Sequence, residues 1–286
     1  MTVASSATES LCEAAARAIT DSKAAVVIGY GADGGSAFRV PVFVRTSDDA
    51  AGLVFDDLCL PNLAVYLTKS EVRAMGKLAV VVKGCDLRAV NVLLRENVID
   101  RKEVVLIGVR CGGVGRPRLA KCAACEMHEP QGCDVVVGEP VTPEAGGNGQ
   151  YAAVDEIEKM TAQQRWEYWQ RQLGKCIRCY ACRQVCPLCY CKRCIVEKST
   201  PQWVETSPHL RGNVAWNVAR ALHLTGRCVG CGECERVCPM NIPLGTLNLK
   251  MARMMEEWYK FRSGMAADEN APFTSWAADD REEDVL

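Results

Sequence analysis

The chain has 286 residues, of which 49% are hydrophobic, and its 34 basic and 35 acidic side chains nearly cancel. This composition is typical of one or two globular domains, and the absence of a charge bias argues against a nucleic-acid partner. No apolar stretch approaches the roughly 20 residues of a membrane-spanning helix, and the start lacks the basic head and apolar core of a secretory signal. Because the 18 cysteines are grouped rather than scattered, we predict a protein of the reducing cytoplasm.

The first half of the chain alternates short apolar runs with helical patterns. Five runs have the length and composition of buried strands: residues 24–28, 40–44, 78–82, 104–109 and 135–137. The segment 78–110 joins a strand, a turn at residues 83–86 (KGCD), an amphipathic helix and a second strand, which is the order of a βαβ unit. We therefore predict an α/β domain with a parallel βαβ core over residues 1–150.

A G-x-G-x-x-G pattern follows the first strand at residues 29–34 (GYGADG). In a dinucleotide site this pattern opens a helix, whose N-terminus receives the pyrophosphate. Here residues 38–44 have the composition of another strand, so we predict a glycine-rich hairpin instead. The better candidates for binding a flavin lie after the later strands: Lys83, Gly84 and Asp86, with Gly112 and Gly113.

Five cysteines of the first half are candidate cluster ligands. Cys85 and Cys111 each follow a predicted strand, so we expect both at the carboxyl edge of the parallel sheet, where open α/β folds bind ligands. Cys122 and Cys125 form a C-x-x-C pair, and Cys133 is a spare or replacement ligand. Single free cysteines are usually small buried hydrophobes, which is our interpretation of Cys12 and Cys59. The five together predict an iron-sulfur cluster in the first domain.

A stretch rich in proline and glycine, residues 140–149 (PVTPEAGGNG), is interpreted as the linker between two domains. Residues 151–175 are predicted to form a linker helix, whose aromatic side chains pack against the cysteine-rich module that follows at 176–262. A final helix is expected at 244–261. Residues 263–286, with their acidic end, are predicted to be a disordered tail.

Two cysteine runs give the most specific signal of the sequence. Both have the spacing C-x-x-C-x-x-C-x-x-x-C-P, in which three close thiolates hold one [4Fe-4S] cubane and the fourth reaches the neighbouring cluster. Structural zinc is the competing interpretation, but two complete runs with both Cys-Pro endings exceed what tetrahedral zinc requires. We predict a mostly helical, ferredoxin-like dicluster domain with two ligand sets: Cys176, Cys179, Cys182 and Cys238 for cluster 1, and Cys228, Cys231, Cys234 and Cys186 for cluster 2.

Three further cysteines, Cys189, Cys191 and Cys194, directly follow the first run. One hypothesis is that they take part in an additional cluster together with a ligand from the first domain. The alternative is that they are redundant thiols. Together with the first-domain group they would suffice for two further cubanes, so the sequence predicts two clusters and has cysteines for up to four.

Two groups of residues resemble known families. Lys83-Gly84-Cys85-Asp86 and the segment from Lys121-Cys122 to Cys125 resemble the G-x-P-C-Q turn and the K-C-x-x-C segment of the beta subunits of deazaflavin-reducing hydrogenases and formate dehydrogenases, with Gly and Asp in place of Pro and Gln. Residues 186–191 (CPLCYC) resemble the C-P-x-C-[FY]-C extension of the two-cluster modules in sulfhydrogenase beta subunits and anaerobic sulfite reductase A subunits. The resemblance implies an iron-sulfur electron path, a flavin in some members, and a place in an anaerobic complex.

These features favour an iron-sulfur electron-transfer subunit of a soluble multi-subunit anaerobic oxidoreductase, relaying single electrons to or from a catalytic or flavin-bearing partner. The three histidines form no nucleophilic pair with a cysteine or an acid, which favours a non-catalytic subunit over an independent enzyme. The alternative is a beta-type subunit that contains FAD and whose first domain itself oxidises or reduces a two-electron carrier. A hydrogenase, a formate dehydrogenase and a heterodisulfide-reductase-type complex are all compatible partners.

Overall fold

A five-stranded sheet organises the first half of the chain in the computed structural model, which describes residues 3–142 and 149–274. The strand order is β2-β1-β3-β4-β5, with β2 antiparallel to β1 and the other neighbours parallel. The bounds are β1 (Val26–Gly31), β2 (Val40–Val44), β3 (Leu78–Val82), β4 (Val104–Val109) and β5 (Val135–Val137). The predicted α/β domain with a parallel core is confirmed, and only the first strand lies later than expected.

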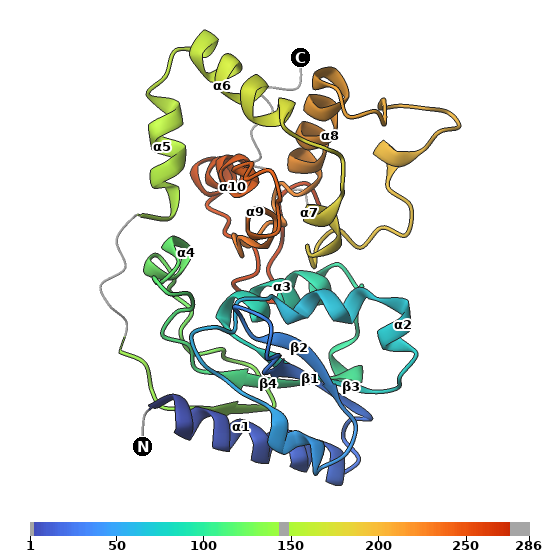
Figure 1. Cartoon of the computed structure of the whole chain (residues 1–286), viewed down its shortest axis with the longest axis vertical. Helices are drawn as coiled ribbons and strands as arrows, with labels where there is room; N and C mark the ends of the chain where they lie inside the picture. The colour runs from blue at the N-terminus through green and yellow to red at the C-terminus, as the bar shows by residue number, and fades with distance from the viewer. Residues whose placement is uncertain (1–2, 143–148, 275–286) are drawn as a thin grey trace.

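Helices cover both faces of this sheet, which explains the uninterrupted apolar sequences of its central strands. α1 (Val3–Thr20) lies on one face and α3 (Gly84–Arg95) on the other (Figure 1). Parallel strands that are covered on both sides need apolar side chains at every position, and each residue of β1 and β3 is buried. α1 turns a stripe of small and apolar side chains inward: Ala7, Leu11, Ala14, Ala15 and Ala18.

The glycine pattern after β1 forms the predicted hairpin. Gly31 pairs with Val40, and residues 32–39 form the connecting loop. A Cβ atom at Gly29 would lie 2.6 Å from the Leu53 side chain, and one at Gly31 would lie 2.6 Å from Val42. These glycines therefore allow neighbouring segments to approach the strand closely, and the interpretation as a hairpin is confirmed.

The second half of the chain is helical. Its helices are α5 (Ala152–Glu158), α6 (Ala162–Gly174), α7 (Ala181–Gln184), α8 (Leu210–His223), α9 (Glu233–Arg236) and α10 (Leu244–Tyr259). The linker helix predicted over 151–175 is thus two helices, because Thr161 starts a new one. Its hydroxyl accepts a hydrogen bond from the backbone N–H of Gln164, whose side chain accepts one from the N–H of Thr161.

Short elements and loops complete the described chain. They are the helices α2 (Ser70–Arg73) and α4 (Ala120–Ala123) and the 3-10 helices η1 (Asp49–Gly52), η2 (Leu63–Thr68), η3 (Arg101–Glu103), η4 (Gly149–Tyr151) and η5 (Ile195–Glu197). Residues 143–148 of the predicted linker and 275–286 of the predicted tail lie outside the described residues. Among the described helices, none has the length and apolar character that crossing a bilayer requires.

The helical half packs on the outer face of α3, which lies between the sheet and the helices α7 to α10 (Figure 1). Arg88 and Asn91 of α3 donate hydrogen bonds to the carbonyls of Ser263 and Gly264, at 2.8 and 3.0 Å. The predicted tail is therefore held against α3 where it begins. Three residues of the helical half, Leu188, Leu224 and Val229, belong to the same buried core as the sheet.

Candidate iron-sulfur centre

The two cysteine runs fold in the same way. α7 begins five residues after Cys176, and α9 begins five residues after Cys228. The residues two and four places after each first cysteine have left-handed backbone: Arg178 (φ 58°) and Tyr180 (φ 59°) in one run, Gly230 (φ 68°) and Gly232 (φ 73°) in the other. Alternating left-handed residues turn successive backbone N–H groups toward a common concavity, a conformation found around iron-sulfur clusters.

The first of these loops adopts this conformation without glycine. Left-handed backbone at a residue with a Cβ costs roughly 1–2 kcal/mol, so Arg178 and Tyr180 need compensating contacts. Arg178 donates hydrogen bonds to the carbonyls of Gly212 and Glu205, at 3.0 and 3.2 Å. Its guanidinium lies 5.4 Å from the Tyr180 ring and 5.3 Å from the Trp216 ring, and the two rings meet edge to face. α8 therefore holds this loop in shape.

The structure divides most of the cysteines of the two runs between two places. Cys176, Cys182 and Cys238 gather in a separate small core, which also contains Leu173 and Trp169 of α6. Cys186, Cys228 and Cys231 pack instead against the core of the first domain. Cys234 belongs to the small core, and its pKa is raised by burial and by the nearby charges of Cys228 and Cys182. The positions of these cysteines thus follow the grouping expected from cross-ligation except for Cys234, which was expected with Cys228 and Cys231. The ligation itself stays a prediction.

Four other cysteines differ from these in burial and in their neighbours: Cys179, Cys189, Cys191 and Cys194. Cys179, expected in cluster 1, is exposed. Cys189 lies against Cys186, and the hydrogen bond between these sulfurs lowers the pKa of Cys189 to about 6 while raising that of Cys186. Cys191 is exposed, and its carbonyl accepts a hydrogen bond from Arg183, which also pairs with Glu197. Cys194 is half-buried. The structure thus separates Cys189 from Cys191 and Cys194, and the hypothesis of an additional cluster stays a prediction.

Buried polar groups surround the two runs in a way that fits cubanes. Asn248 Nδ2 lies 3.5 Å from the Cys234 sulfur, and Asn213 Nδ2 donates to the Cys176 carbonyl at 2.8 Å. The buried Nε of Arg220 has no hydrogen-bond partner among the described residues. Buried N–H donors beside cysteine sulfurs suit a cluster, because its thiolates and inorganic sulfides accept hydrogen bonds. The described cysteine, histidine and acidic side chains form no group of three arranged to hold a single metal ion.

Four of the five candidate cysteines of the first domain lie around the carboxyl edge of the sheet. Cys111 follows β4, and its N–H donates to the carbonyl of His128, whose ring Nδ1 lies 2.8 Å from the Cys111 carbonyl. Burial raises the pKa of Cys85 and of Cys111, and neighbouring thiolates add to this: Cys111 for Cys85, and Cys122 and Cys125 for Cys111. The four thiols therefore lie within electrostatic reach of one another.

Cys85 lies in a helix rather than in the turn predicted for residues 83–86. α3 begins at Gly84, directly after Lys83, so Cys85 belongs to the first helical turn. A Cβ atom at Gly84 would lie 1.9 Å from the carbonyl oxygen of Met127. Only glycine allows the loop that carries Cys122 and Cys125 to pack this closely on the start of α3.

Cys133 lies apart from these four thiols. It precedes β5, and the charges that act on its thiol are those of Arg101 and Asp134 rather than those of other cysteines. Its role as a spare ligand stays a prediction. Its sulfur is 3.0 Å from the position of a Cβ on Gly108, in β4. Cys12 and Cys59 pack in or against the same core, as expected for cysteines that act as small hydrophobes.

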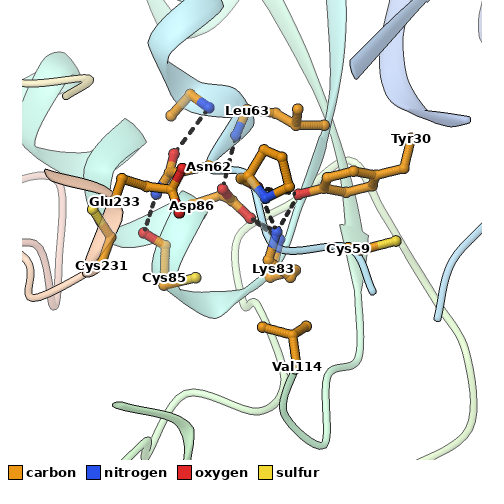
Figure 2. Close-up of polar contacts among 12 residues, drawn as sticks. Tyr30, Cys59, Asn62, Leu63, Lys83, Cys85, Asp86, Val114, Cys231 and Glu233 are labelled. Atoms are coloured by element: carbon orange, nitrogen blue, oxygen red, sulfur yellow. Dashed lines mark hydrogen bonds and ion pairs between the residues drawn. The ribbon is translucent and has the colours of Figure 1, made fainter. Parts of the chain in front are cut away.

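Lys83, Asp86 and Tyr30 form a buried polar network next to Cys85 (Figure 2). Lys83 Nζ lies 2.9 Å from Asp86 Oδ2, donates to the Pro61 carbonyl at 3.0 Å and to the Tyr30 hydroxyl, and is 1% exposed. Burial alone would lower the pKa of Lys83, but the charges of Asp86 and Tyr30 raise it above its usual value. Asn62 Nδ2 donates to the Cys85 carbonyl at 3.2 Å.

This network changes the interpretation of the predicted flavin crevice. The Lys83 and Asp86 side chains are fully buried and bonded within the protein, and Gly84 is covered by Met127. Gly112 is exposed, whereas Gly113 packs against Arg118. Lys83, Gly84 and Asp86 thus give the start of α3 its shape, and of the residues named for a flavin only Gly112 is exposed.

Lys121 links the first domain to the second run. Its Nζ donates to the Cys231 carbonyl, and although burial lowers its pKa, the thiolates of Cys85 and Cys231 raise it by more. Figure 2 shows Cys85 and Cys231 on the same side of the buried network, with Glu233 beside them. A second link is Glu96, which accepts hydrogen bonds from Arg227 at 2.6 and 2.8 Å and from the Tyr190 hydroxyl at 2.7 Å.

Sequence reasoning missed Arg220 and the asparagines beside the cysteines. Asn213, Asn217 and Arg220 are spaced i, i+4 and i+7 on α8 and are all buried. Polar residues with this spacing usually form the solvent face of a helix. Trp216 lies on the same face of α8, and a large aromatic side chain there indicates that this face is buried rather than exposed to solvent.

Comparisons with known proteins agree with this geometry. Residues 175–243 match the family model described as a 4Fe-4S dicluster domain. The chain is 22% identical to the F420-dependent formate dehydrogenase subunit beta of Methanocaldococcus jannaschii, over an alignment of 312 residues that covers 74% of this chain and 80% of the relative. It is 24% identical to the F420-dependent formate dehydrogenase 1 subunit beta of Methanococcus maripaludis, over 82% of this chain and 84% of the relative. Residues 175–243 thus form a 4Fe-4S dicluster domain, within a chain that is similar over most of its length to these beta subunits.

Proposed function

We propose that the chain is the iron-sulfur electron-transfer subunit of an anaerobic oxidoreductase complex. In this proposal electrons pass singly between the first domain and two cubanes held by residues 175–243. A cubane supplies one-electron redox chemistry, and the protein supplies its position, its surroundings and its exposure to solvent. The beta-subunit names of the relatives support a place in a complex, and they favour a formate-dehydrogenase-type partner over the other predicted types.

The observation that carries the proposal is the order of the cysteine groups through the molecule. Cys186, Cys228 and Cys231 pack on the core of the first domain, and Lys121 bonds to the Cys231 carbonyl. Lys121 adjoins Cys122 in the first-domain group. Cys176, Cys182 and Cys238 lie in a core separate from that of the first domain. This order supports a path from the first-domain cysteines through cluster 2 to cluster 1.

Within this path we assign Cys85, Cys111, Cys122 and Cys125 to a third cubane. Their shared position at the carboxyl edge and their mutual effects on pKa support the assignment. Deprotonated thiolates are the ligands of iron, so a pocket that gathers four thiols beside the ammonium of Lys121 suits such a cluster. The burial of Lys83 and Asp86 gives the alternative of a flavin in the same crevice no support.

The deciding experiment is to measure iron, acid-labile sulfide and flavin per chain after anaerobic purification. We expect about twelve irons without flavin, with about four in each of three sites. Cys85→Ala should remove about four irons, whereas the matched control Cys12→Ala should remove none. About eight irons, unchanged in Cys85→Ala, would refute the first-domain cluster, zinc without iron would refute the whole proposal, and stoichiometric flavin would favour the alternative function.

A further inference from the structure

Among the residues that the structure describes, no carboxylate pairs with the buried arginine of α8, Arg220. Arg220 lies near the end of α8, is 5% exposed, and its Nη2 donates to the Cys182 carbonyl at 3.1 Å. Its Nε has no hydrogen-bond partner among the described residues. A guanidinium in such a place needs an acceptor for each N–H and a negative charge nearby.

The charges that act most strongly on Arg220 are those of Cys189 and of cysteines from both ligand sets. Burial lowers the pKa of Arg220, but the thiolates of Cys234, Cys189, Cys186 and Cys182 raise it by more. Conversely, burial raises the pKa of Cys182 and Cys234, and the charge of Arg220 opposes this at both thiols. Cys182 is a predicted ligand of cluster 1, whereas Cys186 and Cys234 are predicted ligands of cluster 2. Arg220 bonds to the Cys182 carbonyl, and Cys182 and Cys234 lie in the same small core, so one cation acts on ligands of both sites.

A buried cation beside a cubane changes the reduction potential of that cubane. A cubane with four thiolates is an anion, and reduction adds another negative charge to it. A buried cation and N–H donors to sulfur stabilise the reduced state more than the oxidised state, so they raise the reduction potential. Arginine suits this position better than lysine because its fork directs several N–H groups in fixed directions and stays charged.

We propose that Arg220 is a positioning residue shared by the two clusters, which donates its Nε–H to a cluster sulfur and raises the reduction potentials of both. This inference rests on the proposed dicluster function. It adds the claim that the two potentials are set together, by one side chain, rather than separately by the surroundings of each run.

The test is a redox titration of three full-length variants, monitored by electron paramagnetic resonance, after iron and sulfide have been measured in each sample. Arg220→Met removes the charge and the donors, and Arg220→Lys keeps the charge but loses the fork. Arg211→Met is the matched control, because Arg211 is exposed on the same helix. We expect both midpoint potentials to shift to more negative values in Arg220→Met, to shift less in Arg220→Lys, and to stay unchanged in Arg211→Met.

Each outcome of the redox titration either supports or refutes the role proposed for Arg220. Unmoved potentials in an iron-replete Arg220→Met protein overturn the inference, and a shift of only one cluster overturns the shared role. If Arg220→Met loses iron, shifted potentials in iron-replete Arg220→Lys support the inference and unshifted ones refute it. Loss of iron in both variants also refutes it, since the role would then be structural. Failure of the dicluster function itself is distinct, because wild-type protein would then lack the [4Fe-4S] signals.

Discussion

We predict that breaking the buried ion pair of Lys83 and Asp86 strongly lowers the stability of the first domain. The two side chains are 1% and 0% exposed, and Nζ lies 2.9 Å from Oδ2. Asp86 also accepts hydrogen bonds from the backbone N–H groups of Leu63 and Lys83, both at 2.9 Å. Asp86→Ala would leave a buried ammonium without its counter-charge and two buried N–H groups without an acceptor.

The expected destabilisation is about 3–5 kcal/mol, the usual cost of removing one partner of a buried ion pair. For a domain of about 150 residues this lowers Tm by about 6–20 °C, at roughly 2–4 °C for each kcal/mol. Lys83→Met should cost less, because Asp86 keeps its two backbone donors. The matched control is Asp21→Ala, which breaks a surface pair with Lys23 whose side chains are 46% and 63% exposed and which is worth at most about 1 kcal/mol.

Anaerobic thermal unfolding of the full chain, followed by circular dichroism, measures these differences. Absorbance of the clusters, recorded in parallel, separates melting of the first domain from loss of iron. The double variant Asp86→Ala with Lys83→Met should be more stable than the sum of the two single effects predicts, because no unpaired ammonium remains. A Tm for Asp86→Ala within the error of Asp21→Ala would refute the argument from burial.

Three further predictions concern the contacts between the domains and the cysteine loops. Glu96→Ala should cost about 1–3 kcal/mol, because Arg227 and Tyr190 lose their half-buried acceptor, and hydrogen exchange should then be faster at residues 226–229. Gly232→Ala, at φ 73° and with a Cβ 3.3 Å from Lys121, should lower Tm and the iron content, whereas exposed Gly34→Ala should leave both unchanged. Exchange of electrons with an acidic ferredoxin should slow as salt rises, because residues 171–198 carry six basic side chains outside the interior and one acidic side chain; a rate independent of ionic strength would contradict this.

The strands and the two ferredoxin-type runs were predictable because each depends on a local pattern. Apolar runs such as residues 78–82 have one stable environment, a buried parallel strand, and the cysteine spacing follows from the size of a cubane. The position of Cys133 was not predictable in the same way. Its distance along the chain from Cys125 is short, but its sulfur packs against Gly108 of β4, and no other cysteine of the described chain is among the charges that act on it.

The polar interior was the part that sequence patterns could not reveal. Lys83, Asp86 and Arg220 are charged residues that hydrophobic periodicity assigns to the surface, yet all three are buried. Specific partners satisfy Lys83 and Asp86, whereas the Nε of Arg220 has no partner among the described residues. The loop residues Arg178 and Tyr180 are a similar case. Nothing in their residue types indicates left-handed backbone, which here depends on rings and carbonyls of α8 that are remote in sequence.

In the proposed electron path, the core shared by the two halves of the chain fixes the distance between their redox centres. Electron transfer between buried centres needs fixed separations, and a flexible linker alone would not hold them. Glu96 binds Arg227, next to Cys228, and Lys121 binds Cys231, so the second run is fastened to the first domain at two of its cysteines. Glu96→Ala should therefore slow electron transfer between the domains while leaving the iron content of each unchanged. Loss of iron together with the rate would show instead that these contacts build the sites rather than set the distance between them.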